Sequence, residues 1–245
     1  MPRANRYFIP GHVWHITHRC HQKEFLLKFV KDRQRWRYWL FEAKKRYRLC
    51  VLNYMVTSNH IHLLVHDQGK GEITQSMQLI AGRTAQEYNQ RKGRKGAYWE
   101  DRYHATAVDT DEYLARCMVY IDLNMVRAGA VKHPRDWVSC GFREIQFPTE
   151  RYTVIDKQML MDLFGVSKFS DLQELHRGWI DEALALNNMQ RDDAWTQSIA
   201  IGGRGFVSSI KESLGTKAQY RDITESIDKH VLKEPTTKYY RLRKQ

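Results

Sequence analysis

Two histidines one residue apart, His60 and His62, have the residue type and the spacing that a chemical site requires. They stand in an apolar run typical of a β-strand, in which side chains alternate between two faces. Both imidazoles therefore point to one face, and Ile61, Leu63 and Val65 point to the other. Two residues of a strand rise about 6.6 Å, so both rings can lean onto one metal ion. The alternative is a pair of hydrogen-bonded structural histidines on a half-buried strand.

A tyrosine and an asparagine on an expected helix form the second candidate group. The helix has Asp109 as its expected N-cap and runs to about Arg127, with Gly129 as its C-terminal cap. Tyr120 and Asn124 are four residues apart, so they lie one turn over the other and can serve one site. The alternative for Tyr120 is amphipathic packing, which is the commoner role of a helical tyrosine.

The periodicity of the chain predicts the elements that would hold these residues. The turn between the two strands at 49–56 and 60–66 is short, so these strands should pair antiparallel. Apolar residues at helical spacing mark the faces that should be buried. In the first helix they are Phe29, Trp36, Leu40 and Ala43, and in the third Leu114, Met118, Ile121 and Met125. The expected strands cover 13–18, 49–56, 60–66 and 104–108, and the expected helices cover 28–47, 73–89 and 109–127.

The composition favours a nucleic-acid partner. The 245 residues include 40 Lys and Arg against 28 Asp and Glu, a formal net charge of +12, and nucleic acid is the polyanion that such an excess usually attracts. Apolar runs fall short of the roughly 18 residues that span a membrane, and the N-terminal residues lack the apolar core of a signal peptide. The cysteines have no paired spacing, which predicts free thiols in the cytoplasm. They are Cys20, Cys50, Cys117 and Cys140.

Three basic segments are candidates for contact with DNA. An extended N-terminal arm carries Arg3 and Arg6, and Arg102 stands before the strand at 104–108. A basic loop punctuated by glycine has the flexibility and charge to close over a phosphate backbone. The alternatives are a solvated terminus for the arm and a mobile linker for the loop. The cations of the loop are Arg91, Lys92, Arg94 and Lys95.

A domain boundary is expected at Pro148. We expect residues 1–148 to form the domain with the candidate chemistry and residues 149–245 to form a mostly helical extension. The extension shows helical periodicity over 155–164, 171–187 and 206–214, and its basic tail from Lys229 is expected to be loose.

Taken together, the motifs resemble a known family. His60-Ile61-His62 comes before a helical segment that reads Tyr120-Ile-Asp-Leu-Asn-Met, and a proline-glycine turn leads into an aromatic-His strand at 10–15. Trp99-Glu-Asp-Arg-Tyr precedes the last expected strand. The order and spacing of these pieces, over about residues 2–142, resemble the REP-associated tyrosine transposases, which are single-tyrosine members of the HUH endonuclease superfamily.

The resemblance implies a fold and a site. The fold is α+β, with a central antiparallel, ferredoxin- or RRM-like sheet flanked by helices and a mostly helical C-terminal extension. The implied metal ligands are His60, His62 and Asn124, and the implied nucleophile is Tyr120. This mixed ligand set suits Mn²⁺ better than Mg²⁺, and we expect either ion to work. Family members usually have proline after the asparagine, and Met125 should instead let the helix continue.

The expected function is metal-dependent cleavage and rejoining of single-stranded DNA through a 5′-phosphotyrosine intermediate. The expected targets flank hairpin, REP-like repeats, and the protein would act as a monomer or homodimer at the bacterial nucleoid. One alternative is a replication initiator or relaxase, which often uses two tyrosines, with Tyr113 as the second. Another is a non-catalytic nucleic-acid-binding module on the same scaffold. A hydrolytic zinc enzyme is disfavoured, because the pair at His60 has no further carboxylate or histidine at helical ligand spacing.

Overall fold

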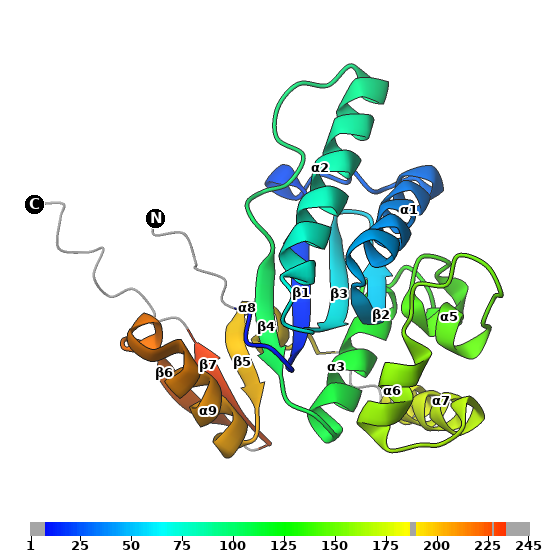
Figure 1. Cartoon of the computed structure of the whole chain (residues 1–245). Coiled ribbons are helices and arrows are strands. Elements are labelled where there is room, and N and C mark those ends of the chain that lie inside the picture. Colours follow the sequence, from blue (N-terminus) through cyan, green and yellow to red (C-terminus); the bar gives the residue numbers. More distant parts are fainter. Residues whose placement is uncertain (1–7, 187–189, 227, 234–245) are drawn as a thin grey trace, which may run out of the picture.

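One mixed sheet with helices on both faces makes up the protein (Figure 1). The computed structural model describes residues 8–186, 190–226 and 228–233. Within these residues the sheet has seven strands in the order β2-β3-β1-β4-β5-β7-β6. The α+β class predicted from the sequence is confirmed. The strands are β1 Val13–Arg19, β2 Cys50–Val56, β3 His60–His66, β4 His104–Val108, β5 Ser198–Gly202, β6 Asp222–Ser226 and β7 Lys229–Lys233.

The four strands nearest the N-terminus form an antiparallel ladder with β3 inside it. β3 pairs with β2 on one side and with β1 on the other, and β1 also pairs with β4. In the β1–β3 register, Thr17 lies opposite His62 and His15 lies opposite Leu64. Because side chains alternate along each strand, His15, Thr17, His60 and His62 all share one face of the sheet.

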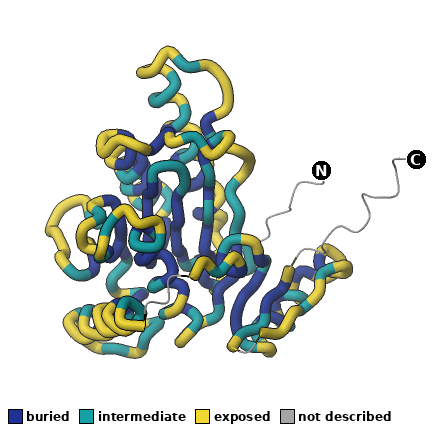
Figure 2. The backbone as a smooth tube through the Cα atoms, turned by 180° about the vertical axis from the view of Figure 1, so that it is seen from behind, coloured by how far each residue is buried: buried dark blue, intermediate teal, exposed yellow. Residues whose placement is uncertain are grey.

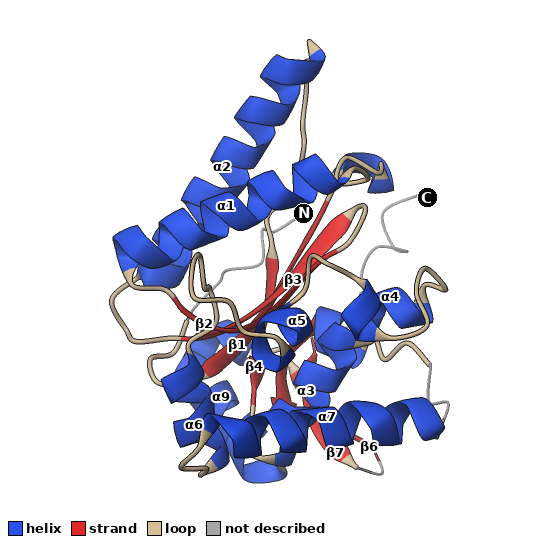
Figure 3. Cartoon of the chain, turned by 90° about the vertical axis from the view of Figure 1, so that its right-hand side faces the viewer, coloured by secondary structure: helices blue, strands red, loops and turns tan. Residues whose placement is uncertain are grey.

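Helices cover both faces of this ladder. Figure 3 shows α1 (Val30–Tyr47) and α2 (Glu72–Lys92) on one side, and α3 (Glu112–Asp122) on the other side with α6 (Lys157–Phe164) and α7 (Phe169–Ala185). The strands run through the buried interior between these layers (Figure 2). The apolar face of β3 is fully buried at Ile61, Leu63 and Val65. Removal of this apolar surface from water holds the strand in place and leaves the histidine face for the site.

The buried face of α1 agrees with the sequence prediction except at one position. Trp36, Leu40 and Ala43 are fully buried, whereas Phe29 is 52% exposed. Phe29 has extended backbone and lies one residue before the helix begins, so it is outside the helical stripe. Its ring lies near the amino groups of Lys28 and Lys92 instead.

The predicted helix over 109–127 is divided in two. The helix α3 begins at Glu112, and a break at Leu123 separates it from the single turn of α4 (Asn124–Arg127). The break lies two residues before Met125, and the chain is helical again through Met125 up to Arg127, so Met125 itself does not end the helix. The predicted apolar stripe is confirmed, because all four of its members are buried. They are Leu114, Met118, Ile121 and Met125.

The predicted N-cap, Asp109, has a different partner. Its carboxylate accepts hydrogen bonds from the backbone N–H groups of Thr110 and Gly203 at 2.9 and 3.0 Å. The chain must pass close to Asp109 here, because a Cβ atom on Gly202 would lie only 2.4 Å from the Asp109 Cβ. Asp109 thus fastens the turn between β5 and α9 (Arg204–Leu214) to the end of β4 rather than capping α3.

The C-terminal extension contains the predicted helices and also three strands. The predicted helices correspond to α6, α7 and α9 (Arg204–Leu214). The strand β5 pairs parallel with β4 and continues the sheet into β7 and β6, which the sequence analysis did not predict. The loose tail expected from Lys229 was wrong for residues 229–233, which form β7, and residues 234–245 lie outside the described part. The division after residue 148 stays a prediction.

A buried polar cluster joins the extension to α3. The Oδ2 atom of Asp122 lies 2.8 Å from the Nε2 atom of His176 on α7, and both side chains are fully buried. The other oxygen of Asp122 accepts a hydrogen bond from the Asn53 side chain on β2 at 3.1 Å. This cluster fixes the C-terminal end of α3 between the sheet and α7, two residues after Tyr120.

Two further predictions concern thiols and membranes. The four cysteines are buried free thiols, as predicted. None of the helices in the described residues has the length and apolarity that crossing a membrane would need.

Candidate active site

A cavity of about 650 Å³ opens at the histidine face of the sheet. It lies between β1, β3, the α3–α4 pair and the segment 191–197 of the extension. Five of the residues predicted to form the site line it together. These are His60, His62, Arg102, Tyr120 and Asn124. The remaining lining residues include three arginines absent from the predicted site: Arg19, Arg127 and Arg191.

His60 is held at the mouth of the cavity by its own turn. Its Nδ1 atom lies 2.7 Å from the Oδ1 atom of Asn59 and 3.0 Å from the hydroxyl of Thr57. These contacts occupy one ring nitrogen and leave Nε2 for the cavity. Burial, reinforced by the positive charges of Arg19 and Arg191, lowers the pKa of His60 to about 4. The ring is therefore neutral at pH 7, which is the form that binds a metal.

His62 lies deeper and is bonded through both ring nitrogens. Its Nε2 atom is 2.9 Å from the Nδ2 atom of Asn124, and its Nδ1 atom is 2.9 Å from the Nε2 atom of His15. The other nitrogen of His15 is 2.8 Å from the backbone carbonyl oxygen of Trp195. Burial lowers the pKa of His62 well below its ordinary value and lowers the pKa of His15 to about 3. Both imidazoles are therefore neutral near pH 7.

Tyr120 lies beside the histidines on α3. Its ring centroid is 5.8 Å from that of His62 and 6.1 Å from that of His15. The residue is only 6% exposed, yet it lines the cavity. The guanidinium of Arg127 lies 4.4 Å from the tyrosine ring centroid, and Trp195 packs on the ring at 6.1 Å. Burial raises the pKa of Tyr120, and the nearby cations Arg127 and Arg191 oppose this rise.

Arg127 and Arg191 are functional candidates that the sequence analysis missed. Arg127 stands seven residues after Tyr120, which places it two turns along the same face, and this spacing was a usable signal. Its guanidinium also donates to the Tyr120 carbonyl. Arg191 lies in an irregular segment of the extension and pairs with Asp193 at 2.8 Å, and no periodic pattern points to it.

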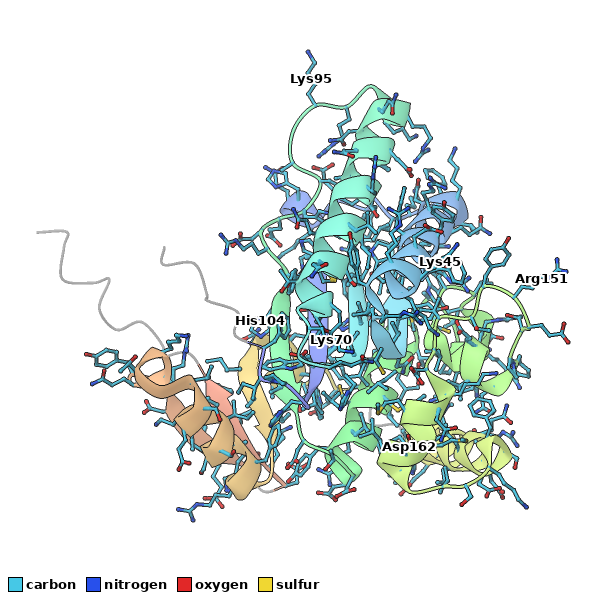
Figure 4. The ribbon with its side chains drawn as sticks, in the orientation of Figure 1. Lys45, Lys70, Lys95, His104, Arg151 and Asp162 are labelled. Atoms are coloured by element: carbon cyan, nitrogen blue, oxygen red, sulfur yellow. The ribbon has the colours of Figure 1, made fainter. Side chains whose placement is uncertain are left out.

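The predicted DNA-contact residues separate into three groups. Arg102 lines the cavity, whereas Arg3 and Arg6 lie outside the described residues. The four cations of the predicted basic loop do not line the cavity, and Arg91 and Lys92 lie in the last turn of α2 rather than in a loop. Arg91 pairs with Asp32, and Arg94 pairs with Glu24 at 3.1 Å. Figure 4 shows Lys95 projecting from the loop beyond the end of α2, far from the strand that carries His104.

Tyr113, the candidate second nucleophile, lies apart from the cavity. Its hydroxyl donates a hydrogen bond to the carbonyl oxygen of Asp228 at 3.3 Å. Seven residues separate it from Tyr120, so the two side chains leave α3 in similar directions at different heights. Only Tyr120 of this pair lines the cavity.

The residues of the cavity fit a divalent cation with mixed nitrogen and oxygen ligands. In the described residues no group of three or more His, Cys, Asp and Glu side chains could hold a metal ion. The third ligand that the family resemblance implies beside His60 and His62 is the amide of Asn124, which already touches His62. An asparagine amide presents either its oxygen or its nitrogen after a half turn, so Oδ1 can take the place of Nδ2. Two neutral imidazoles and one amide oxygen suit Mn²⁺.

Comparisons with known proteins give one matching family model and two solved structures that align with the chain. Residues 10–124 match the family model of IS200-like transposases. A solved structure of a REP-associated tyrosine transposase bound to a REP hairpin is similar, with a TM-score of 0.51 and 21% identity, over 64% of this chain and 94% of that chain. A putative transposase from Deinococcus radiodurans R1 gives a TM-score of 0.35 and 13% identity, over 46% of this chain and 88% of that chain. No curated protein matches the chain.

Proposed function

We propose that this protein, in which residues 10–124 match the family model of IS200-like transposases, cuts and rejoins single-stranded DNA through a covalent phosphotyrosine intermediate. The observation that carries the proposal is the meeting of Tyr120 with His62 and Asn124 in one cavity. The ring of Tyr120 lies 5.8 Å from that of His62, and Asn124 bonds to the same histidine.

In this proposal His60, His62 and Asn124 hold a divalent cation. The cation would act as a Lewis acid that polarises a phosphate oxygen and orients the phosphodiester. His60 and His62 offer neutral nitrogens at pH 7, because burial lowers the pKa of each ring. Mn²⁺ should serve at lower concentrations than Mg²⁺, since Mg²⁺ prefers a shell of oxygen ligands.

Tyr120 is the proposed nucleophile. Its hydroxyl oxygen bonds to phosphorus while the bond from phosphorus to the 3′ oxygen breaks. The DNA then carries a 5′-phosphotyrosine link on one side and a free 3′-hydroxyl, which has gained a proton, on the other. Attack by a 3′-hydroxyl on the same phosphorus reverses the step and rejoins strands without ATP. The phenol must lose its proton first, and burial works against that loss by raising the pKa of Tyr120.

The arginines of the cavity oppose the rise in the pKa of Tyr120. They also balance the negative charge of the DNA. Arg127 and Arg191 both favour the ionised form of Tyr120. Four lining arginines face only two lining carboxylates, those of Glu100 and Asp101. A positively charged cavity attracts a phosphodiester and stabilises the extra negative charge that develops on it during attack.

The proposed substrate is single-stranded DNA beside a hairpin. The similar transposase of known structure is bound to a REP hairpin, and the net charge of +12 suits a polyanion. Aromatic and cationic side chains around the cavity mouth can stack on unpaired bases. The protein would act in the bacterial cytoplasm at the nucleoid, as a monomer or homodimer.

The direct experiment compares cleavage by the parent protein and by Tyr120→Phe. The substrate is an end-labelled hairpin with single-stranded flanks, incubated with Mn²⁺. Phenylalanine fills nearly the same space but has no oxygen, so cleavage should fall below detection while binding persists. The matched control is Tyr113→Phe, which should cleave as the parent does. Loss of cleavage in both variants would favour a two-tyrosine replication initiator or relaxase, and binding without cleavage by the parent would favour a non-catalytic module.

Removal of metal tests the second part of the proposal. Dialysis against a chelator should abolish cleavage, and Mn²⁺ or Mg²⁺ should restore it. Cleavage that persists after complete metal removal would contradict the metal role of His60 and His62. His62→Ala should behave as the chelated parent does at every metal concentration.

A further inference from the structure

We propose that His15 and the backbone carbonyl of Trp195 fix the tautomer of His62 and thereby hold its Nε2 atom ready as a metal ligand. The inference rests on the proposed function in one respect, because it takes His62 as a ligand. It adds a positioning residue from β1 and a contribution from the C-terminal extension.

The hydrogen bond between His15 and the backbone carbonyl of Trp195 has a fixed direction. A backbone carbonyl oxygen can only accept, so the Nδ1 atom of His15, 2.8 Å from the Trp195 oxygen, must carry the proton. The side chain of His15 is fully buried, and a charge there would lose its hydration. A neutral imidazole with a proton on Nδ1 has its lone pair on Nε2.

The protonation of His15 also fixes the direction of the hydrogen bond between His15 and His62. The Nε2 atom of His15 lies 2.9 Å from the Nδ1 atom of His62 and can only accept. The Nδ1 atom of His62 must therefore donate, which leaves its Nε2 atom without a proton. On the other side, the Nδ2 atom of Asn124 lies 2.9 Å from the same Nε2 atom, and an N–H donor there is compatible with this assignment. Two successive bonds thus run in one direction, from His62 through His15 to the Trp195 carbonyl.

The two candidate metal-binding histidines are oriented by different means. His60 is bonded through Nδ1 to Asn59 and Thr57, which are one and three residues away. His62 depends on His15, 47 residues away, and through it on Trp195, which lies 180 residues from His15. Partners of this kind set the orientation and tautomer of a ligating histidine. The tautomer of His62 is consequently a tertiary property, whereas that of His60 is local.

The Trp195 carbonyl is itself held in place. The segment that carries it is anchored to β4, because the Ser198 carbonyl accepts from the Thr106 hydroxyl at 2.6 Å and lies 2.8 Å from the His104 ring nitrogen. The ring of Trp195 also packs against Tyr120. The extension therefore touches the nucleophile candidate with a side chain, and with a main-chain oxygen it touches His15, the residue that orients His62.

The test uses two substitutions of His15 in the full-length protein. His15→Phe keeps a planar ring and removes both nitrogens. His15→Gln keeps an amide oxygen that can reach the position of Nε2 and accept from His62. The first readout is the two-bond ¹H–¹⁵N correlation spectrum of the metal-free protein, which reports which nitrogen of His62 is protonated. The second is affinity for Mn²⁺ alone, measured by titration calorimetry, with thermal unfolding as the check on folding.

In the parent we expect the proton of His62 on Nδ1. His15→Phe should shift it to Nε2 or give a mixture, and Mn²⁺ should bind about 10- to 100-fold more weakly, as for other lost partners of ligating histidines. His15→Gln should recover most of the affinity and the parent tautomer, which a merely structural role would not require.

Either of two results would overturn the inference: a proton on Nε2 in the metal-free parent, or parent-like Mn²⁺ affinity in a folded His15→Phe protein. If His15→Phe does not fold, the parent and His15→Gln spectra decide. A parent that shows the expected tautomer but does not bind Mn²⁺ would contradict the metal role in the proposed function and leave the hydrogen-bond direction standing.

Discussion

The two regions that line the cavity contribute different kinds of group. The strands β1 and β3 and the α3–α4 pair present side chains that could act on a phosphodiester, and all of them project from regular elements. The segment 191–197 of the extension brings a cation, a tryptophan face and a main-chain oxygen, mostly from irregular chain or a single turn. We infer that the two regions have different roles. The first supplies the reacting side chains, and the second orients them and adds positive charge.

The two arginines beside Tyr120 provide the largest contrast between the regions. Arg127 belongs to α4, is half-buried and lies 4.4 Å from the tyrosine ring centroid. Replacing it by methionine should lower the cleavage rate by about 10²- to 10³-fold, because a cation aimed at developing negative charge is lost. Single-turnover cleavage of the labelled hairpin substrate measures this loss.

Arg127→Met should also change the pH dependence of cleavage. The positive charge of Arg127 favours the phenolate and lowers the pKa of Tyr120, so its removal raises that pKa. The rise of cleavage rate with pH should therefore move to higher pH in the variant. Arg127→Lys, which keeps a charge without the planar guanidinium, should lie between the parent and Arg127→Met. An unshifted pH profile in Arg127→Met would show that Arg127 does not influence the ionisation of Tyr120.

The arginine of the extension should have a smaller effect. Arg191 is 57% exposed and is already paired with Asp193. Solvent screens such a charge, so Arg191→Met should slow cleavage only about tenfold. Arg204→Met, an exposed arginine of α9 outside the cavity, is the matched control and should leave the rate unchanged. Equal losses of cleavage rate in Arg127→Met and Arg191→Met would contradict the proposed difference between the two regions.

The smallest expected effect concerns binding rather than chemistry. Arg102 lines the cavity mouth, so Arg102→Ala should weaken single-stranded DNA binding a few-fold and reduce its salt dependence by about one phosphate contact. Lys95→Ala, at the far end of α2, should change affinity less. Fluorescence anisotropy at several salt concentrations checks both, and unchanged affinity in Arg102→Ala would remove this residue from the DNA contacts.

The same contrast explains how much of the structure the sequence could reveal. The alternation of side chains along a strand predicts that His60 and His62 share one face. Helical spacing predicts the same for Tyr120 and Asn124. The α+β class inferred from their order is confirmed, and residues 10–124 match the family model of IS200-like transposases. The same reasoning could have identified Arg127, because it stands two helical turns after Tyr120 and therefore on the same face.

His15 required one more piece of information. Alternation alone puts His15 and Thr17 on one face of β1, but only the pairing of Thr17 with His62 shows that this face is also that of the site. Trp195 and Arg191 could not be predicted in this way. Their position depends on β5 joining the sheet beside β4, a long-range parallel pairing that leaves no local period in the sequence.

The covalent adduct itself tests the central claim most directly. Trypsin cuts after Arg116 and Arg127, so Tyr113 and Tyr120 fall on different peptides. After the parent protein is incubated with the hairpin substrate and Mn²⁺, digested and analysed by mass spectrometry, the nucleotide mass should be attached to Tyr120 in the peptide 117–127. An adduct on the peptide with Tyr113, or cleaved DNA without any protein adduct, would contradict the account.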